Sequence, residues 1–178
     1  MLKMNAQEQF ISEFFRVHHI GNATVTSYTV HELEAAIWGL IFGKLLKNVA
    51  FIFEERGEIT CKDFIATAQK RVRRNRKSKR MHSQHVAAEC SDNKRALKNI
   101  KIITSLSETN LRSFDYLRIY EKETAFVAEI NLNELDPVAW ANLITSSVKA
   151  VADGQKRNDP KHNDIMTMFR LCLYEEDC

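Results

Sequence analysis

The feature that most constrains the fold of this chain is an internal repeat. Two segments, which start near Glu13 and Asp115, align without gaps at a shift of about 102 residues. The identical pairs are Arg16/Arg118, Ala23/Ala125, Val25/Val127, Glu32/Glu134, Leu33/Leu135 and Trp38/Trp140. The Trp pair weighs most, because the chain has only two Trp residues. The sequence therefore predicts one unit that occurs twice, and the competing explanation is coincidence helped by a shared strand-then-helix pattern.

Each copy has the pattern of a β-hairpin followed by two helices. Runs of β-branched and aromatic residues predict strands at 14–18, 23–30, 116–120 and 125–132. Asp136-Pro137 is typical of a helix start, and Gly57 and Gly154 mark the expected ends of the two long helices. The shorter helices are expected to open at Thr60 or Cys61 and at Asn163 or Asp164.

One copy alone would bury only a thin core, so the two copies are expected to share one. We therefore expect an α+β fold of two tandem ββαα repeats, residues 1–72 and 114–178, related by a pseudo-twofold axis. Their hairpins would form one four-stranded antiparallel sheet with helices on one face, in a single compact domain. A helix-rich basic linker, residues 73–113, would join the copies. Within it, the spacing of Ala96, Ile100 and Ile103 predicts a helix near 92–106.

The C-terminal half resembles a small uncharacterised bacterial family of ββαα domains. The similarity consists of LRIY at 117–120, the hairpin, DPVAW at 136–140, and a last helix that ends in YEE at 174–176. It covers about Phe114 to Glu176, and more weakly the first copy, which lacks the Asp-Pro pair. That family has no known activity, so the resemblance implies the ββαα fold and no function.

A strongly basic segment follows the first copy. Residues 70–80 contain eight Lys or Arg and no acid, whereas the whole chain has 26 basic and 23 acidic residues. The basic residues are Lys70, Arg71, Arg73, Arg74, Arg76, Lys77, Lys79 and Arg80. Such a segment can neutralise phosphates and release their counterions, so we expect contact with nucleic acid. No aromatic residue interrupts the run, so base stacking is unsupported there. A solvated linker, a partner-docking helix and a targeting signal are the alternatives.

The apolar helix expected near 35–56 supports a different hypothesis. Ile37, Leu40, Ile41, Phe42, Leu45, Phe51, Ile52 and Phe53 offer more apolar surface than one thin layer needs. This surface could bury against a protein partner or a second copy, which would make the protein an interaction module or adaptor. Lys44, Lys47 and Asn48 lie in mid-segment and argue against a membrane span.

Enzymatic chemistry has little support in the sequence. No Gly-rich phosphate loop, nucleophile elbow or HExxH motif is present, so we expect a non-enzymatic protein without a cofactor. His82, His85 and Cys90 are metal-ligand types, but they lack a fourth ligand at a recognisable spacing. The four cysteines show no CxxC pair and no export signal is visible, so we expect reduced thiols in a cytoplasmic protein.

Overall fold

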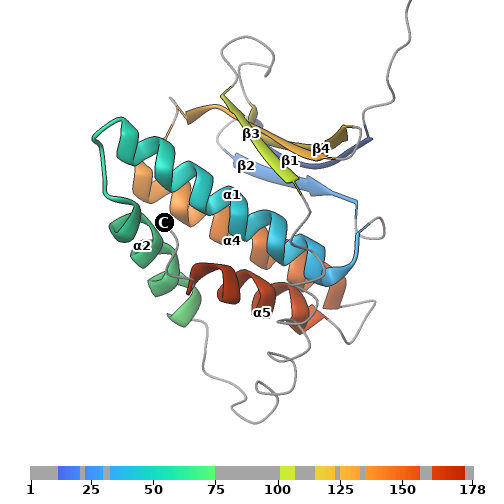
Figure 1. The fold of residues 1–178 in the computed structure, drawn as a ribbon. Helices are drawn as coiled ribbons and strands as arrows, with labels where there is room; N and C mark the ends of the chain where they lie inside the picture. The colour runs from blue at the N-terminus through green and yellow to red at the C-terminus, as the bar shows by residue number, and fades with distance from the viewer. Residues whose placement is uncertain are drawn as a thin grey trace, which may run out of the picture.

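The computed structural model describes residues 12–20, 23–29, 33–74, 101–106, 115–122, 125–132, 135–156 and 162–174. Within them the chain has an α+β fold (Figure 1). The strands are β1 (Ser12–Ile20), β2 (Ala23–Tyr28), β3 (Lys101–Leu106), β4 (Asp115–Lys122) and β5 (Ala125–Ile130). The helices are α1 (Ala35–Glu55), α2 (Cys61–Arg74), α4 (Pro137–Lys156) and α5 (His162–Leu173).

The sheet has five strands in the order β2-β1-β4-β5-β3, and it is mixed rather than purely antiparallel. β1 pairs with β2 and β4, and β4 pairs with β5, all antiparallel. β3 adds to the edge of β5 in parallel. The expected four-stranded antiparallel sheet is therefore wrong in one respect. A fifth strand, β3, comes from the segment between the two expected copies and pairs in parallel.

The helix predicted near 92–106 is wrong for its last six residues, because 101–106 forms β3. Three consecutive β-branched residues, Ile102, Ile103 and Thr104, favour a strand, and the free edge of β5 supplies the backbone partners. Thr104 also accepts a 2.8 Å hydrogen bond from the Asn48 side chain, which ties β3 to α1. Residues 92–100 lie outside the described part of the chain.

The helices cover one face of the sheet, as expected. α1 and α4 lie next to the sheet, and α2 and α5 form the layer beyond them (Figure 1). Trp38 and Trp140 are both fully buried in the core between these layers. Trp38 packs edge-to-face on Phe14 at 5.4 Å, and Trp140 packs edge-to-face on Tyr116 at 6.5 Å. Each Trp thus anchors its helix to a neighbouring strand.

Helix α1 uses its apolar length to build the core. Among the described helices it alone is long and apolar enough to cross a membrane, yet 67% of its most apolar window is buried inside the protein. Gly39 and Gly43 let it approach α5 closely, because a Cβ at either position would collide with Met168 or Cys172. The helix is therefore central to the fold.

Several helix boundaries were predicted correctly. The Thr60 hydroxyl accepts a 3.1 Å hydrogen bond from the Asp63 amide at the start of α2, and the Asp136 carboxylate accepts one of 2.7 Å from Ala139 before α4. Gly57 follows α1 with a positive φ of 71°, a conformation that glycine adopts without strain.

The expected end of α4 at Gly154 is wrong, because the helix continues to Lys156. Gly154 serves a packing role instead. A Cβ there would collide with the Tyr28 hydroxyl, which donates a 3.0 Å hydrogen bond to the Ala150 carbonyl. The absence of a side chain at 154 therefore lets β2 and α4 meet.

The cysteines differ from one another. Cys61, at the start of α2, is disulfide-bonded, so the expectation of reduced thiols is wrong for this residue. Cys172 on α5 is buried and packs against Gly43. Cys90 and Cys178 lie outside the described residues.

Candidate nucleic-acid interface

Helix α2 carries the described part of the basic segment. One face is buried through a regular stripe of Cys61, Phe64, Ile65, Ala68 and Val72. This stripe fixes the rotation of the helix, and Lys70, Arg71 and Arg73 lie off it and are exposed. The first turn holds Lys62 and Asp63, and the other four basic residues of α2 lie in its last five positions, where cations match the helix dipole.

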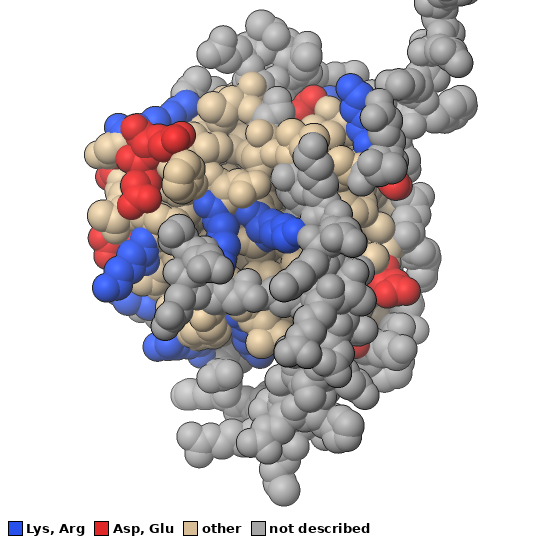
Figure 2. Space-filling model, viewed as in Figure 1, with Lys and Arg blue, Asp and Glu red and all other residues tan. Residues whose placement is uncertain are grey.

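Lys70, Arg71 and Arg73 are all exposed on the C-terminal half of α2. Arg74 ends the helix, and its side chain is not among the described ones. Figure 2 shows Lys and Arg along the lower left of the molecule, over α2, and acidic side chains above them near the end of α1. The other predicted site residues, Arg76, Lys77, Lys79 and Arg80, lie outside the described residues.

The end of α5 meets the basic half of α2. Arg73 Nε donates a 3.2 Å hydrogen bond to the Tyr174 hydroxyl, and its guanidinium carbon lies 5.8 Å from the centre of the Tyr174 ring. The Gln69 amide also donates a 2.9 Å hydrogen bond to the Leu173 carbonyl. Tyr174, which is 47% exposed, thus lies beside the basic residues. Arg73 and Tyr174 are 101 positions apart, so no local sequence pattern could have revealed the contact.

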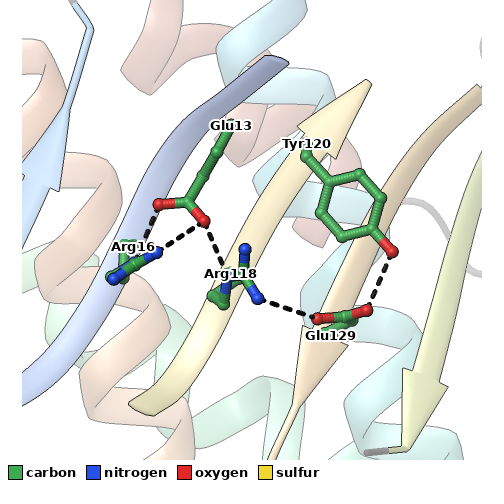
Figure 3. Close-up of polar contacts among 5 residues, drawn as sticks. All are labelled: Glu13, Arg16, Arg118, Tyr120 and Glu129. Carbon is green, nitrogen blue, oxygen red and sulfur yellow. Dashed lines mark hydrogen bonds and ion pairs between the residues drawn. The ribbon is translucent and has the colours of Figure 1, made fainter. Parts of the chain in front are cut away.

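A cluster of polar side chains that was not expected from the sequence lies on the sheet. It consists of Glu13, Arg16, Arg118, Tyr120 and Glu129, from the three adjacent strands β1, β4 and β5 (Figure 3). Leu117 and Ile119 alternate with Arg118 and Tyr120 along β4 and are buried in the core, so the polar side chains occupy the face away from the helices. In the sequence, this cluster could have been detected only from the alternation of apolar and polar residues along β4.

Glu13 is the centre of this polar cluster. Its carboxylate accepts two hydrogen bonds of 2.8 Å from Arg16 and one of 2.6 Å from Arg118. Burial favours a raised pKa for Glu13, but the hydrogen bonds from the two arginines outweigh it and hold the pKa below its ordinary value of 4.5. The same hydrogen bonding raises the pKa of Arg16.

The far end of the cluster joins Arg118 to a tyrosine through Glu129. The Glu129 carboxylate lies 3.6 Å from the Arg118 guanidinium and accepts a 2.8 Å hydrogen bond from the Tyr120 hydroxyl. Burial and this hydrogen bond raise the pKa of Tyr120 to about 12. Two positive and two negative charges therefore offset each other within the cluster, which leaves it poorly suited to bind an anion.

Most of the apolar residues of α1 that were expected to contact a protein partner are buried within this chain. Leu40, Ile41, Phe42, Leu45 and Phe53 are buried by at least 98%, and Ile37 and Ile52 are partly buried. Of the eight apolar residues considered, only Phe51 is classed as exposed, at 51%. Helix α1 therefore offers little free surface to a second chain.

Metal binding gains no support from the described residues. No group of three or more His, Cys, Asp and Glu side chains among them could hold a metal ion. His82, His85 and Cys90 lie outside this part of the chain.

In comparisons with known proteins, the chain matches no protein-family model, no curated protein and no solved structure.

Proposed function

We propose that this protein is a non-enzymatic binding protein that contacts nucleic acid through its basic segment 70–80. The observation that carries the proposal is the exposure of Lys70, Arg71 and Arg73 on a helix whose opposite face is buried. Like charges three or four positions apart on a helix repel each other. Lys70 lies three positions from Arg73 and four from Arg74, so this repulsion opposes folding and a bound polyanion would relieve it.

A structural role for the same cations is the main competing explanation. Cations near a helix C-terminus stabilise it by about 0.3–1 kcal/mol through the helix dipole. That effect needs only one or two charges, whereas the segment carries eight. The run also extends past Arg74, the last residue of α2, to Arg80. The excess supports a polyanionic partner, and phosphate oxygens suit Arg, which grips them bidentately.

Salt-dependent binding tests the proposal. Replacing Arg71, Arg73, Arg74 and Arg76 together with Ala should remove up to four phosphate contacts. The slope of log K against log salt on duplex DNA should then fall in magnitude by up to roughly 3–4. The matched control replaces four exposed cations elsewhere, Arg56, Lys62, Lys122 and Lys149, and so changes the net charge equally.

Fluorescence anisotropy across a salt series measures both variants against the wild type. The proposal predicts that the Arg71 set loses most of its binding while the control set keeps it. Two results would overturn it: a wild type that binds no nucleic acid at low salt, or equal losses in the two variants.

For the scaffold, the proposal is two tandem ββαα repeats related by a pseudo-twofold axis. The pairing of β1 with β4 supports it, because Arg16 lies opposite Arg118, its own counterpart in the repeat. The two register shifts of this ladder fall at Phe14 and at Tyr116, which are also counterparts. An axis between Arg16 and Arg118 would exchange the two strands.

Contacts further from this axis follow the same shift of about 102 residues. The Thr29 amide donates to the Phe14 carbonyl at 3.1 Å, and the Asn131 amide donates to the Tyr116 carbonyl at 2.9 Å. The edge-to-face contacts of Trp38 and Trp140 are related in the same way. An experimental structure in which residues 13–53 and 115–155 fail to superpose would contradict the duplication.

A further inference from the structure

The proposed interface contains one aromatic ring, and its surroundings fix where that ring lies. Tyr174 directly follows α5, and the hydrogen bond from Gln69 to Leu173 holds this end of α5 against α2. Arg73 then holds the tyrosine through its hydroxyl and its ring. A ring restrained in this way loses little further freedom when a ligand packs on it.

Tyr174 keeps a large exposed surface, although Arg73 contacts both its hydroxyl and its ring. It is 47% exposed, whereas Tyr116 and Tyr120 on the sheet are only 5% and 9% exposed. Nearly half of the Tyr174 surface is therefore open to solvent. Its exposed part adjoins Arg73, an exposed cation of the proposed phosphate-binding surface.

We propose that Tyr174 and Arg73 form a platform on which an unpaired base stacks, so that the ligand class is single-stranded nucleic acid. This inference rests on the proposed function. Proteins that bind single strands combine cations that follow the phosphates with aromatic rings that carry the bases, and every base has a face that can stack. In a duplex both faces of a base are already stacked, so the platform gains nothing from it.

The test compares ring chemistry at position 174 in the full-length protein. Tyr174→Leu keeps apolar volume but removes the ring, and Tyr174→Phe keeps the ring but removes the hydroxyl that Arg73 contacts. The probes are a labelled single strand of about 16 nucleotides, the matching duplex, and inorganic polyphosphate, which has charge but no bases.

Stacking predicts that Tyr174→Leu weakens single-strand binding by roughly 5- to 100-fold. Binding of polyphosphate and duplex should stay within about twofold, because the cations are unchanged. Tyr174→Phe should retain most of the single-strand affinity, since the ring remains. Thermal unfolding of both variants shows whether the fold is kept.

The outcomes separate the two proposals. If the wild type binds none of the probes, the proposed function fails, and the inference fails with it. If the wild type binds and Tyr174→Leu binds the single strand equally well, only the stacking inference fails. Equal losses in Tyr174→Leu and Tyr174→Phe would also overturn stacking, because the hydroxyl would then matter and the ring would not.

A photo-cross-link in the wild type gives a second measurement that needs no variant. A single strand carrying bromouracil is irradiated in the complex, and the attached residue is identified by mass spectrometry. Attachment at Tyr174 is expected, and attachment only to residues distant from Tyr174 and Arg73 would overturn the inference.

Discussion

Arg16 on β1 lies directly opposite Arg118 on β4, and both guanidinium groups donate to the carboxylate of Glu13. Like charges opposite each other across a strand pair destabilise the sheet. Both side chains are about three-quarters buried, so water screens their repulsion only in part. Glu13 therefore allows two arginines to occupy the centre of the sheet.

Glu13→Gln should lower the free energy of unfolding by about 1–3 kcal/mol. The amide keeps the shape of the side chain but leaves the two arginines without the negative charge they share. Urea denaturation measures the loss. Glu121→Gln on β4 is the control, because that side chain is exposed, and it should change stability by less than about 0.5 kcal/mol. Equal effects of the two variants would contradict the role assigned to Glu13.

The stability that Glu13 provides should disappear in acid. The pKa of Glu13 is lower in the folded protein than its ordinary value of 4.5, so the unfolded chain takes up the proton first as pH falls. The contribution is therefore complete above about pH 4.5 and is lost as pH falls through the folded pKa. Urea denaturation across this range should show the wild type and Glu13→Gln converging in acid. A difference that stays constant with pH would contradict the prediction.

Tyr120 should produce the opposite dependence in alkali. Its pKa rises from 10.0 to about 12 on folding, so the unfolded chain loses this proton first. The contribution to stability is present below pH 10.0 and falls as pH rises toward about 12. Absorbance of tyrosinate should show a late step in the alkaline titration, and Tyr120→Phe should remove that step. In the control, Tyr174→Phe, the late step should remain.

Most helices and strands could be predicted from the sequence, because apolar residues recur at a different spacing in helices than in strands. Phe64, Ile65, Ala68 and Val72 have the spacing of one helix face, and all four residues are buried in α2. β3 was missed because Ala96, Ile100 and Ile103 also have helical spacing, while the strand depends on an edge of β5 that lies elsewhere in the chain. Local patterns cannot show which edge a strand will find.

Of the candidate site, only the cluster of positive charges could be predicted from the sequence. The sequence shows where the cations cluster, but not that Tyr174 comes to lie against Arg73, because that contact depends on how α5 packs on α2. The cluster around Glu13 was hidden for the same reason, since its five residues come from three strands. Both arrangements follow from tertiary packing, which spacing along one segment does not encode.

Gly154 offers a test of packing between the first hairpin and α4. In an isolated helix, Gly154→Ala would gain about 1 kcal/mol, because glycine is a poor helix former. Here the new Cβ must displace the Tyr28 hydroxyl and so break its hydrogen bond to Ala150. We expect a net loss of about 1–2 kcal/mol.

The double variant Tyr28→Phe/Gly154→Ala should recover part of this loss, because the colliding oxygen is gone. The coupling between the two sites, measured by urea denaturation of both single variants and the double, should be about 0.5–1.5 kcal/mol. Ser146→Ala, exposed on the same helix, is the control and should stabilise the protein by a few tenths of a kcal/mol. If Gly154→Ala were as stabilising as helix propensity alone predicts, Tyr28 could not lie where a Cβ at 154 would reach it.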